Sequence, residues 1–168
     1  MKRWIAALLS GLLLLGCCGC RQRVKTPEKV LEQLLAAMGE QAHCSRIYTR
    51  KELMKTEEGQ TFLSSLYGKT ELPPHFESVS DCALALSRKD DGFEIQVFYV
   101  DHLSEAERVE ELLLLRASLL KSVENKRYMM DDYDHYIAST AVCRKGSYIF
   151  LLCGGDNDMC LEILEKIL

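Results

Sequence analysis

The chain of 168 residues lacks a hydrophobic run long enough to cross a membrane as a helix. Its longest apolar stretch, Ile5 to Gly16, has 12 residues, whereas a membrane-spanning helix needs roughly 20. Lys2 and Arg3 precede this stretch, and a short apolar core behind positive charges is typical of a secretory signal peptide. We therefore predict that residues 1–16 form a cleaved leader and not a transmembrane anchor.

An excess of positive charge is also missing. The full chain carries 21 Lys+Arg against 25 Asp+Glu, a formal net charge of −4. Loss of Lys2 and Arg3 with the leader lowers the basic count to 19 and the net charge to −6. Such a surface repels phosphate backbones. We therefore expect no nucleic-acid partner.

The sequence has few of the residue patterns that are typical of redox, metal-binding or nucleophilic sites. Past residue 25 there is no Cys-x-x-Cys pair, the usual mark of a thiol redox enzyme. His43, His75 and His102 have no serine or cysteine placed to form a nucleophile–base pair. We expect no catalytic residue, no cofactor and no metal site. Free and mostly buried thiols are expected at the five remaining cysteines, which are Cys44, Cys82, Cys143, Cys153 and Cys160.

The chain does contain Leu14-Leu15-Gly16-Cys17 directly behind the apolar run. This stretch resembles the lipobox of bacterial lipoproteins, which implies a diacylglyceryl group on the Cys17 thiol and cleavage before that residue. Two acyl chains make a lasting anchor, whereas one holds only marginally. The alternative is a metal or disulfide knot of Cys17, Cys18 and Cys20, but no histidine or second cysteine pair lies nearby at zinc-like spacing. We predict lipid attachment at Cys17, a lipidated tether over residues 17–25, and a position on the extracytoplasmic face of the cell membrane.

Residues 26–168 are predicted to form a single globular α+β domain with its core in residues 80–168. Thr26 and Pro27 suit the N-cap and first turn of a helix, and Gly39 suits its end. The following stretch, up to residue 80, predicts one or two short helices divided near Gly59. The domain thus opens with a helical segment.

Two hairpins alternate with two helices after residue 80. The hairpins turn at Asp91-Gly92 and at Lys145-Gly146. A capping box of Ser104 and Glu107 predicts the start of a long helix, and Asp156 or Asn157 predicts the start of the last one. The predicted order of elements is therefore two successive strand-strand-helix units. We predict that they form a four-stranded antiparallel sheet with helices packed on one face.

The register of the first hairpin decides which side chains share a face. A two-residue turn would pair Leu86 with Val97, placing both on one face and Glu94 on the other. The second hairpin is apolar on both faces, and such strands are normally covered on both. Either the N-terminal helix covers the second face, or part of that face, with Phe98 and Val100, binds a partner.

Three segments together resemble a known family. They are Glu94-Ile95-Gln96-Val97-Phe98, a helix carrying Arg116 and followed by Tyr133 or Tyr136, and Lys145-Gly146-Ser147-Tyr148-Ile149. They are similar to a family of Gram-positive lipoproteins catalogued as a domain of unknown function, over about residues 80–168 and the lipoprotein-like start. The family has no assigned activity, so the resemblance implies a lipoprotein and assigns no catalytic residue.

Arg116 is the single most informative side chain, because it follows four leucines at the edge of an apolar stripe. In one interpretation, the aliphatic part of the Arg116 side chain packs on the core and the guanidinium group lies in water. The other pairs the guanidinium with a carboxylate such as Glu94 or Asp134, as a structural ion pair or an anion site.

Two polar stretches are weaker candidates. Residues 131–136 gather Asp131, Asp132, Asp134 and His135, but they lack the spaced oxygens and turn glycine of a calcium loop. The stretch Gly154-Gly155-Asp156-Asn157-Asp158 offers helix-start amides to an anion. A solvated loop and a turn with an N-cap are the favoured interpretations.

These observations predict a non-enzymatic binding or scaffolding module, anchored outside the cytoplasmic membrane by its lipid. Its expected partners are the membrane and a protein of the cell envelope. The alternative is a hydrolase-like envelope enzyme with a site built from residues 131–158 and Arg116.

Overall fold

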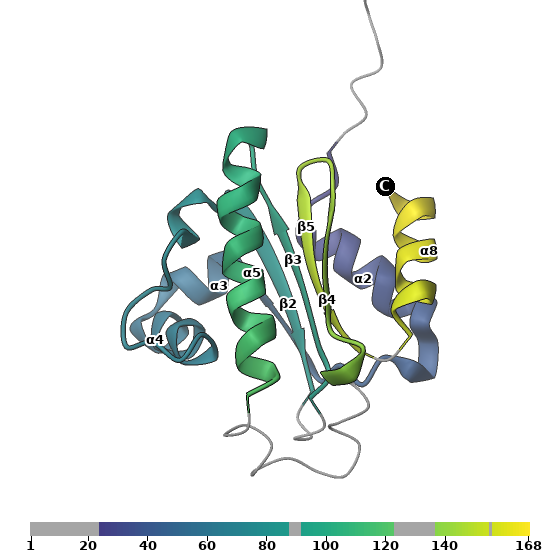
Figure 1. The fold of residues 1–168 in the computed structure, drawn as a ribbon, viewed down its shortest axis with the longest axis horizontal. Helices are drawn as coiled ribbons and strands as arrows, with labels where there is room; N and C mark the ends of the chain where they lie inside the picture. The colour runs from purple at the N-terminus through teal and green to yellow at the C-terminus, as the bar shows by residue number, and fades with distance from the viewer. Residues whose placement is uncertain (1–23, 88–91, 123–136, 155) are drawn as a thin grey trace, which may run out of the picture.

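The fold is an open five-stranded antiparallel sheet with helices on both faces (Figure 1). The computed structural model describes residues 24–87, 92–122, 137–154 and 156–168. The predicted α+β class and the antiparallel sheet are confirmed. The strands are β1 (Arg46–Thr49), β2 (Asp81–Leu86), β3 (Glu94–Tyr99), β4 (Ala141–Lys145) and β5 (Tyr148–Cys153), in the spatial order β1-β2-β3-β5-β4.

Helices cover the two faces of the sheet in separate groups, which Figure 1 shows on its two sides. One face packs against α3 (Arg50–Lys55), α4 (Glu57–Leu66), α5 (Ala106–Leu120) and the short 3-10 turn η2 (Phe76–Ser78), and a second such turn, η3 (Leu103–Glu105), precedes α5. The other packs against α2 (Pro27–Met38) and α8 (Asn157–Ile167), with η1 (Gly39–Gln41) following α2. The two hydrophobic cores therefore lie on opposite sides of one sheet.

The prediction that the two helices after residue 80 pack on one face of the sheet is wrong, because α5 packs on one face and α8 on the other. The central strands carry large apolar side chains on both sides, so each side must be covered. Val30, Leu31 and Leu34 of α2 are fully buried in the second core, which confirms that the N-terminal helix covers the second face. Phe98 and Val100 are fully buried in the other core, so the option that they bind a partner is wrong.

A sheet of four strands was also a wrong prediction, because β1 adds a fifth. Its four residues pair antiparallel with β2, from Arg46 opposite Leu86 to Thr49 opposite Ala83. A strand this short carries too little alternation to stand out between helical patterns. Only its pairing with β2 identifies it as part of the sheet.

The predicted register of the first hairpin is wrong. Leu86 lies opposite Glu94, and not opposite Val97. The observed and predicted partners of Leu86 are three residues apart on β3. Because side chains alternate between the two faces, this odd shift places every β3 side chain on the face opposite to the predicted one, relative to β2. Glu94 consequently lies on the same face as Leu84 and beneath α5.

Helix ends follow local signals in most places. Thr26 and Asp156 cap α2 and α8 as predicted, each accepting a hydrogen bond from a backbone N–H in the first turn. Gly39 ends α2 with a φ of 58°, a conformation that glycine adopts without strain. The predicted capping box of α5 is wrong, since Ser104 lies in η3 and no side chain caps the helix.

The five cysteines of the described residues are free thiols, as predicted. Cys82, Cys153 and Cys160 are buried, and Cys44 and Cys143 are partly so. Cys143 lies opposite Phe150 in the β4–β5 pair, which puts its side chain on the face away from Cys153. The expectation that these two do not form a disulfide is confirmed.

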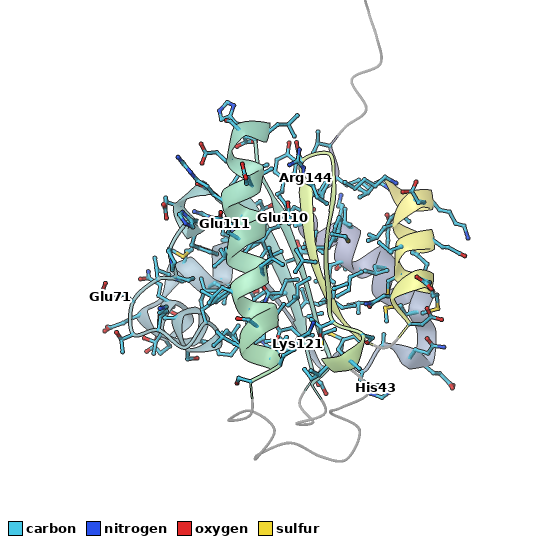
Figure 2. All side chains as sticks on the ribbon, in the orientation of Figure 1. His43, Glu71, Glu110, Glu111, Lys121 and Arg144 are labelled. Atoms are coloured by element: carbon cyan, nitrogen blue, oxygen red, sulfur yellow. The ribbon has the colours of Figure 1, made fainter. Side chains whose placement is uncertain are left out.

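The C-terminal end of α5 is held to the second hairpin. Lys121 lies at the lower end of α5 in Figure 2. Its Nζ donates a hydrogen bond of 3.4 Å to the backbone oxygen of Thr140. The hairpin itself turns through Gly146 and Ser147, with Lys145 opposite Tyr148. β4 lies at one edge of the sheet and β1 at the other.

Candidate functional site

Arg116 of α5 and Glu94 of β3 form a buried, bidentate ion pair. The Arg116 Nε donates to Glu94 Oε1 at 2.9 Å, and Nη2 donates to Oε2 at 2.6 Å. The two side chains are 12% and 4% exposed. Of the two interpretations of Arg116, the paired guanidinium therefore holds, with Glu94 as its partner.

The pair is part of a longer chain of hydrogen bonds across the sheet face. The Gln96 amide donates to Glu94 Oε1 at 2.5 Å, and the Tyr67 hydroxyl donates to Gln96 Oε1 at 2.8 Å. Gln96 and Tyr67 are themselves buried. We call Tyr67, Glu94, Gln96 and Arg116 the buried polar network.

Local structure explains why these groups meet. Glu94 and Gln96 are two residues apart on β3, so both point to the face beneath α5. Arg116 also donates through Nη1 to the backbone oxygen of Leu66, the last residue of α4, at 2.5 Å. A cation at the C-terminal end of a helix interacts favourably with its dipole. The network thus joins α4, α5 and the sheet.

Charge and burial set the protonation of the network. Burial lowers the pKa of Arg116, but the attraction and hydrogen bonds of Glu94 outweigh it, so that pKa lies above its ordinary value. Burial, together with the negative charge of Glu94, raises the pKa of Tyr67 well above its ordinary value. Arg116 is therefore charged and Tyr67 neutral over the physiological pH range.

The network is a structural tie and offers no reacting group. The Arg116 head group is occupied by Glu94 and by Leu66, and the Gln96 amide lies between two partners. A buried charge pair in which each nitrogen and oxygen has a hydrogen-bond partner fixes one arrangement of the elements around it. The alternative enzyme site drew on Arg116, whose three nitrogen atoms each donate to Glu94 or to Leu66 in this geometry.

Several predicted site residues lie outside the described residues. These are Cys17 with the leader and most of the tether, and the loop of Asp131, Asp132, Tyr133, Asp134, His135 and Tyr136. Asp156 lies inside the described part and accepts a hydrogen bond from the Met159 N–H at 2.9 Å. This confirms the N-cap interpretation of that stretch.

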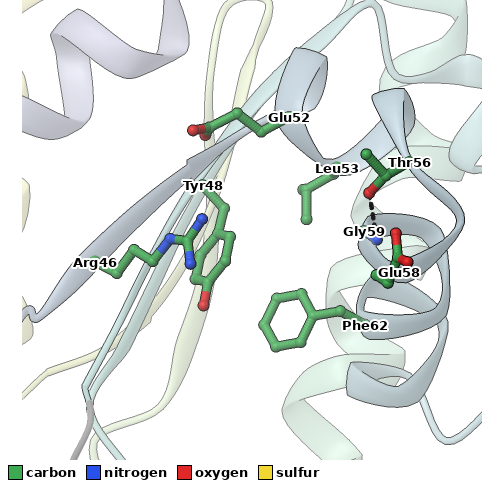
Figure 3. Close-up of a pocket in the computed structure, with 8 residues that line it drawn as sticks. All are labelled: Arg46, Tyr48, Glu52, Leu53, Thr56, Glu58, Gly59 and Phe62. Carbon is green, nitrogen blue, oxygen red and sulfur yellow. Dashed lines mark hydrogen bonds between the residues drawn. The ribbon is translucent and has the colours of Figure 1, made fainter.

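A hollow beside β1 was not predicted from the sequence. It holds about 300 Å³ and lies between β1, α3 and α4 (Figure 3). Its floor is apolar and includes Leu53 and Phe62, while its rim carries charge. We call it the α4-side hollow; the residues that line it are Arg46, Tyr48, Glu52, Leu53, Thr56, Glu58, Gly59 and Phe62.

Aromatic contacts shape this hollow. The rings of Tyr48 and Phe62 are stacked with their centres 4.7 Å apart. The Arg46 guanidinium lies over the Tyr48 ring, 4.5 Å from its centre, a favourable cation–π contact. Arg46 and Tyr48 point from β1 toward α4 in Figure 3, so two elements that are separated in sequence by α3 form facing walls.

The acidic residues of the rim differ in their partners. Glu52 and Thr49 form a capping box at the start of α3, with the Thr49 N–H donating to Glu52 Oε2 at 2.9 Å. This hydrogen bond, helped by the charge of Arg46, holds the pKa of Glu52 below its ordinary value. Glu58, on the first turn of α4, is exposed.

A second hollow of about 410 Å³ lies on the other side of β1, between that strand, α2 and α3. We call it the α2-side hollow. Ile47 and Thr49 of β1 line it, and Glu52 is common to both hollows. Its other lining residues are Glu28, Glu32, Lys51 and Lys55.

The sequence contains weak signals for this region. Arg46-Ile47-Tyr48-Thr49 is rich in β-branched and aromatic residues, which favour a strand, and Thr49-x-x-Glu52 is a capping box pattern. Neither signal shows that β1 lies at a sheet edge. The hollows depend on that position and on the packing of α4.

Comparison with known proteins gives no relative: the chain matches no protein-family model, no curated protein and no solved structure. The resemblance to a Gram-positive lipoprotein family therefore stays a prediction. Within the described ranges, no three His, Cys, Asp or Glu side chains gather as a metal site would require. In that same part of the chain, no helix combines the length and apolar character that a bilayer span needs.

Proposed function

We propose that this protein is a lipid-anchored binding or scaffolding module on the extracytoplasmic face of the cell membrane. The observation that carries the proposal is the short apolar run that ends in Leu14-Leu15-Gly16-Cys17 behind two positive charges. A leader of this kind directs export, and a diacylglyceryl group on Cys17 holds the exported domain at the membrane.

The way the chain enters the domain supports this arrangement. The Tyr148 hydroxyl donates to the backbone oxygen of Lys25 at 2.5 Å, and Lys25 Nζ donates to the backbone oxygen of Ile167 at 2.6 Å. These contacts fix the first described residues at the end of the sheet where β5 begins. A tether attached there leaves the rest of the domain facing away from the lipid.

The surface around β1 supports a binding role. Arg46 lies opposite Leu86 in the sheet, at the end of the strands opposite to Tyr148. The α4-side hollow thus lies away from the tether end, where a partner can reach it. The use of Arg116 in the fold supports a binding role over the enzyme alternative, which drew on that residue.

Membrane fractionation of the full chain tests the anchor. We expect the wild-type protein in the membrane fraction, released by detergent and not by high salt, and Cys17→Ala in the soluble fraction or uncleaved. Cys20→Ala is the matched control and stays with the membrane. Mass spectrometry is expected to show a mature product that begins at a diacylated Cys17. An intact leader with an unmodified Cys17 thiol contradicts the proposal.

A further inference from the structure

The free edge of the sheet at β1 is the starting point of the inference. Among the described residues no strand lies beyond β1, and none of its four residues is buried. An edge strand presents backbone N–H and C=O groups that another strand can pair with. β1 is short and lies between two hollows, so the edge is open on both sides.

The two hollows correspond to the two faces of β1. Arg46 and Tyr48 line the α4-side hollow, and Ile47 and Thr49 line the α2-side hollow. Successive side chains of an added strand point alternately to the two faces. They would enter one hollow and then the other, which is how strand addition obtains affinity from the backbone and specificity from alternate side chains.

The charges of the α4-side hollow indicate which side chain it takes. Glu52 is engaged by Thr49 and lies near Arg46. No hydrogen bond or ion pair joins Glu58 to another residue of the described part, and Glu57 and Glu58 also line an adjoining depression with Phe62. One negative charge above an apolar floor suits a basic side chain, whose stem covers apolar surface while its head stays at the rim.

The charges of the α2-side hollow point the same way. Its lining carries three glutamates, Glu28, Glu32 and Glu52, against two lysines, Lys51 and Lys55. With Glu52 counted once, the two hollows together carry four glutamates against Arg46, Lys51 and Lys55. The edge as a whole is therefore net negative, and complementary charge selects and orients a partner.

We propose that β1 is a docking edge for an extended segment of a partner protein, which adds to the sheet as a further strand and places a Lys or Arg side chain beside Glu58 (Figure 3). This deepens the proposed function and rests on it, because it names the surface and partner chemistry of the binding module.

The test uses the full chain in mild detergent and blocked hexapeptides as probes. The first probe is Thr-Lys-Val-Lys-Val-Thr, and the second replaces both lysines by glutamate. Two more probes carry N-methyl groups on the second and fourth or on the third and fifth residues of the lysine peptide. Because backbone N–H groups alternate between the edges of a strand, only one of these two methylated peptides keeps the N–H groups that face β1.

We expect the lysine peptide to bind about tenfold more tightly than the glutamate peptide and to slow hydrogen exchange in residues 44–50. One methylated probe binds as the parent does and the other does not. Glu58→Lys removes or reverses the preference for lysine. Glu162→Lys, which makes the same charge change at an exposed position of α8, leaves that preference unchanged.

Three results overturn the inference. They are no slowing of exchange at β1 with millimolar peptide, equal binding of the two methylated probes, and a dimer of the protein alone whose β1 is already protected. The last result would make a second copy the occupant. The outcome is independent of the anchor, since an unmodified Cys17 refutes the proposed function and leaves these peptide measurements intact.

Discussion

At the scale of single residues, the burial of two charges is the feature with the largest energetic consequence. Removal of an ion pair from water is costly, and the pair repays that cost only while both partners are present. Arg116 and Glu94 make two direct contacts below 3 Å in a site that is almost fully buried. Loss of one partner would leave the other charged and unsatisfied.

Arg116→Met is expected to lower the free energy of unfolding by about 3 kcal/mol. Methionine keeps the apolar stem, so the loss reports on the uncompensated Glu94 carboxylate and the unpaired oxygen of Leu66. Chemical denaturation measures it. The control is Arg108→Met on the same helix, whose ion pair with Glu105 is exposed and is expected to contribute little to stability. An unchanged or higher melting temperature for Arg116→Met would contradict a structural role for the pair.

At the scale of elements, the α3–α4 corner depends on a close approach of two backbones. A Cβ atom added at Gly59 would lie 2.5 Å from the backbone oxygen of Leu53. The N–H of Gly59 also donates to the Thr56 hydroxyl at 3.1 Å, which caps α4 (Figure 3). Glycine at this position lets α4 begin against α3 and form one wall of the α4-side hollow.

Gly59→Ala is therefore expected to destabilise the protein by about 1–3 kcal/mol through overpacking. The usual effect inside a helix has the opposite sign, since alanine is favoured over glycine by up to about 1 kcal/mol. Urea denaturation gives the sign directly. Thr61→Ala, at an exposed position of the same helix, serves as the control and is expected to be neutral or slightly stabilising. A gain in stability for Gly59→Ala would show that the corner is looser than described.

At the scale of the whole molecule, both cores hold thiols in the neutral form. Burial raises the pKa of Cys153 and of Cys160 to about 11, and burial with a nearby thiol raises that of Cys143 to about 11. Burial also raises the pKa of Cys82 and Tyr67. These groups ionise more easily in the unfolded chain, whose thiols titrate near their ordinary value of about 8.5.

The effect of pH on folding stability has a definite sign for these thiols. Each folded pKa lies above the unfolded one, so the stabilisation is complete below about pH 8.5 and is lost as the pH rises through about 11. We expect the midpoint of urea unfolding to be level from pH 6 to 8 and to fall steeply between pH 9 and 11. Replacing Cys143, Cys153 and Cys160 by alanine should flatten that fall. A midpoint that is constant up to pH 11 would contradict burial of the thiols.

Local signals account for the part of the fold that was predictable. Thr26, Gly39 and Asp156 act on backbone groups within one helical turn, so their roles can be read from neighbouring residues. Alternating apolar residues likewise predicted strands β2, β3, β4 and β5. The odd number and the apolar setting of the five cysteines past the tether predicted free thiols. The sequence by itself thus determined the α+β class and most of the elements. The leader and the modified Cys17 stay predictions from the sequence.

Only the tertiary structure decided how these elements meet. The partner of Arg116 was open between two carboxylates until the register of β3 placed Glu94 beneath α5. Tyr67 joined them from a segment whose proximity to β3 no local pattern encodes. The strand order, the edge position of β1 and the two hollows arise in the same way. Each depends on the length of a connection and on which apolar face must be buried, and a shift of one residue in register reverses the face that every side chain occupies.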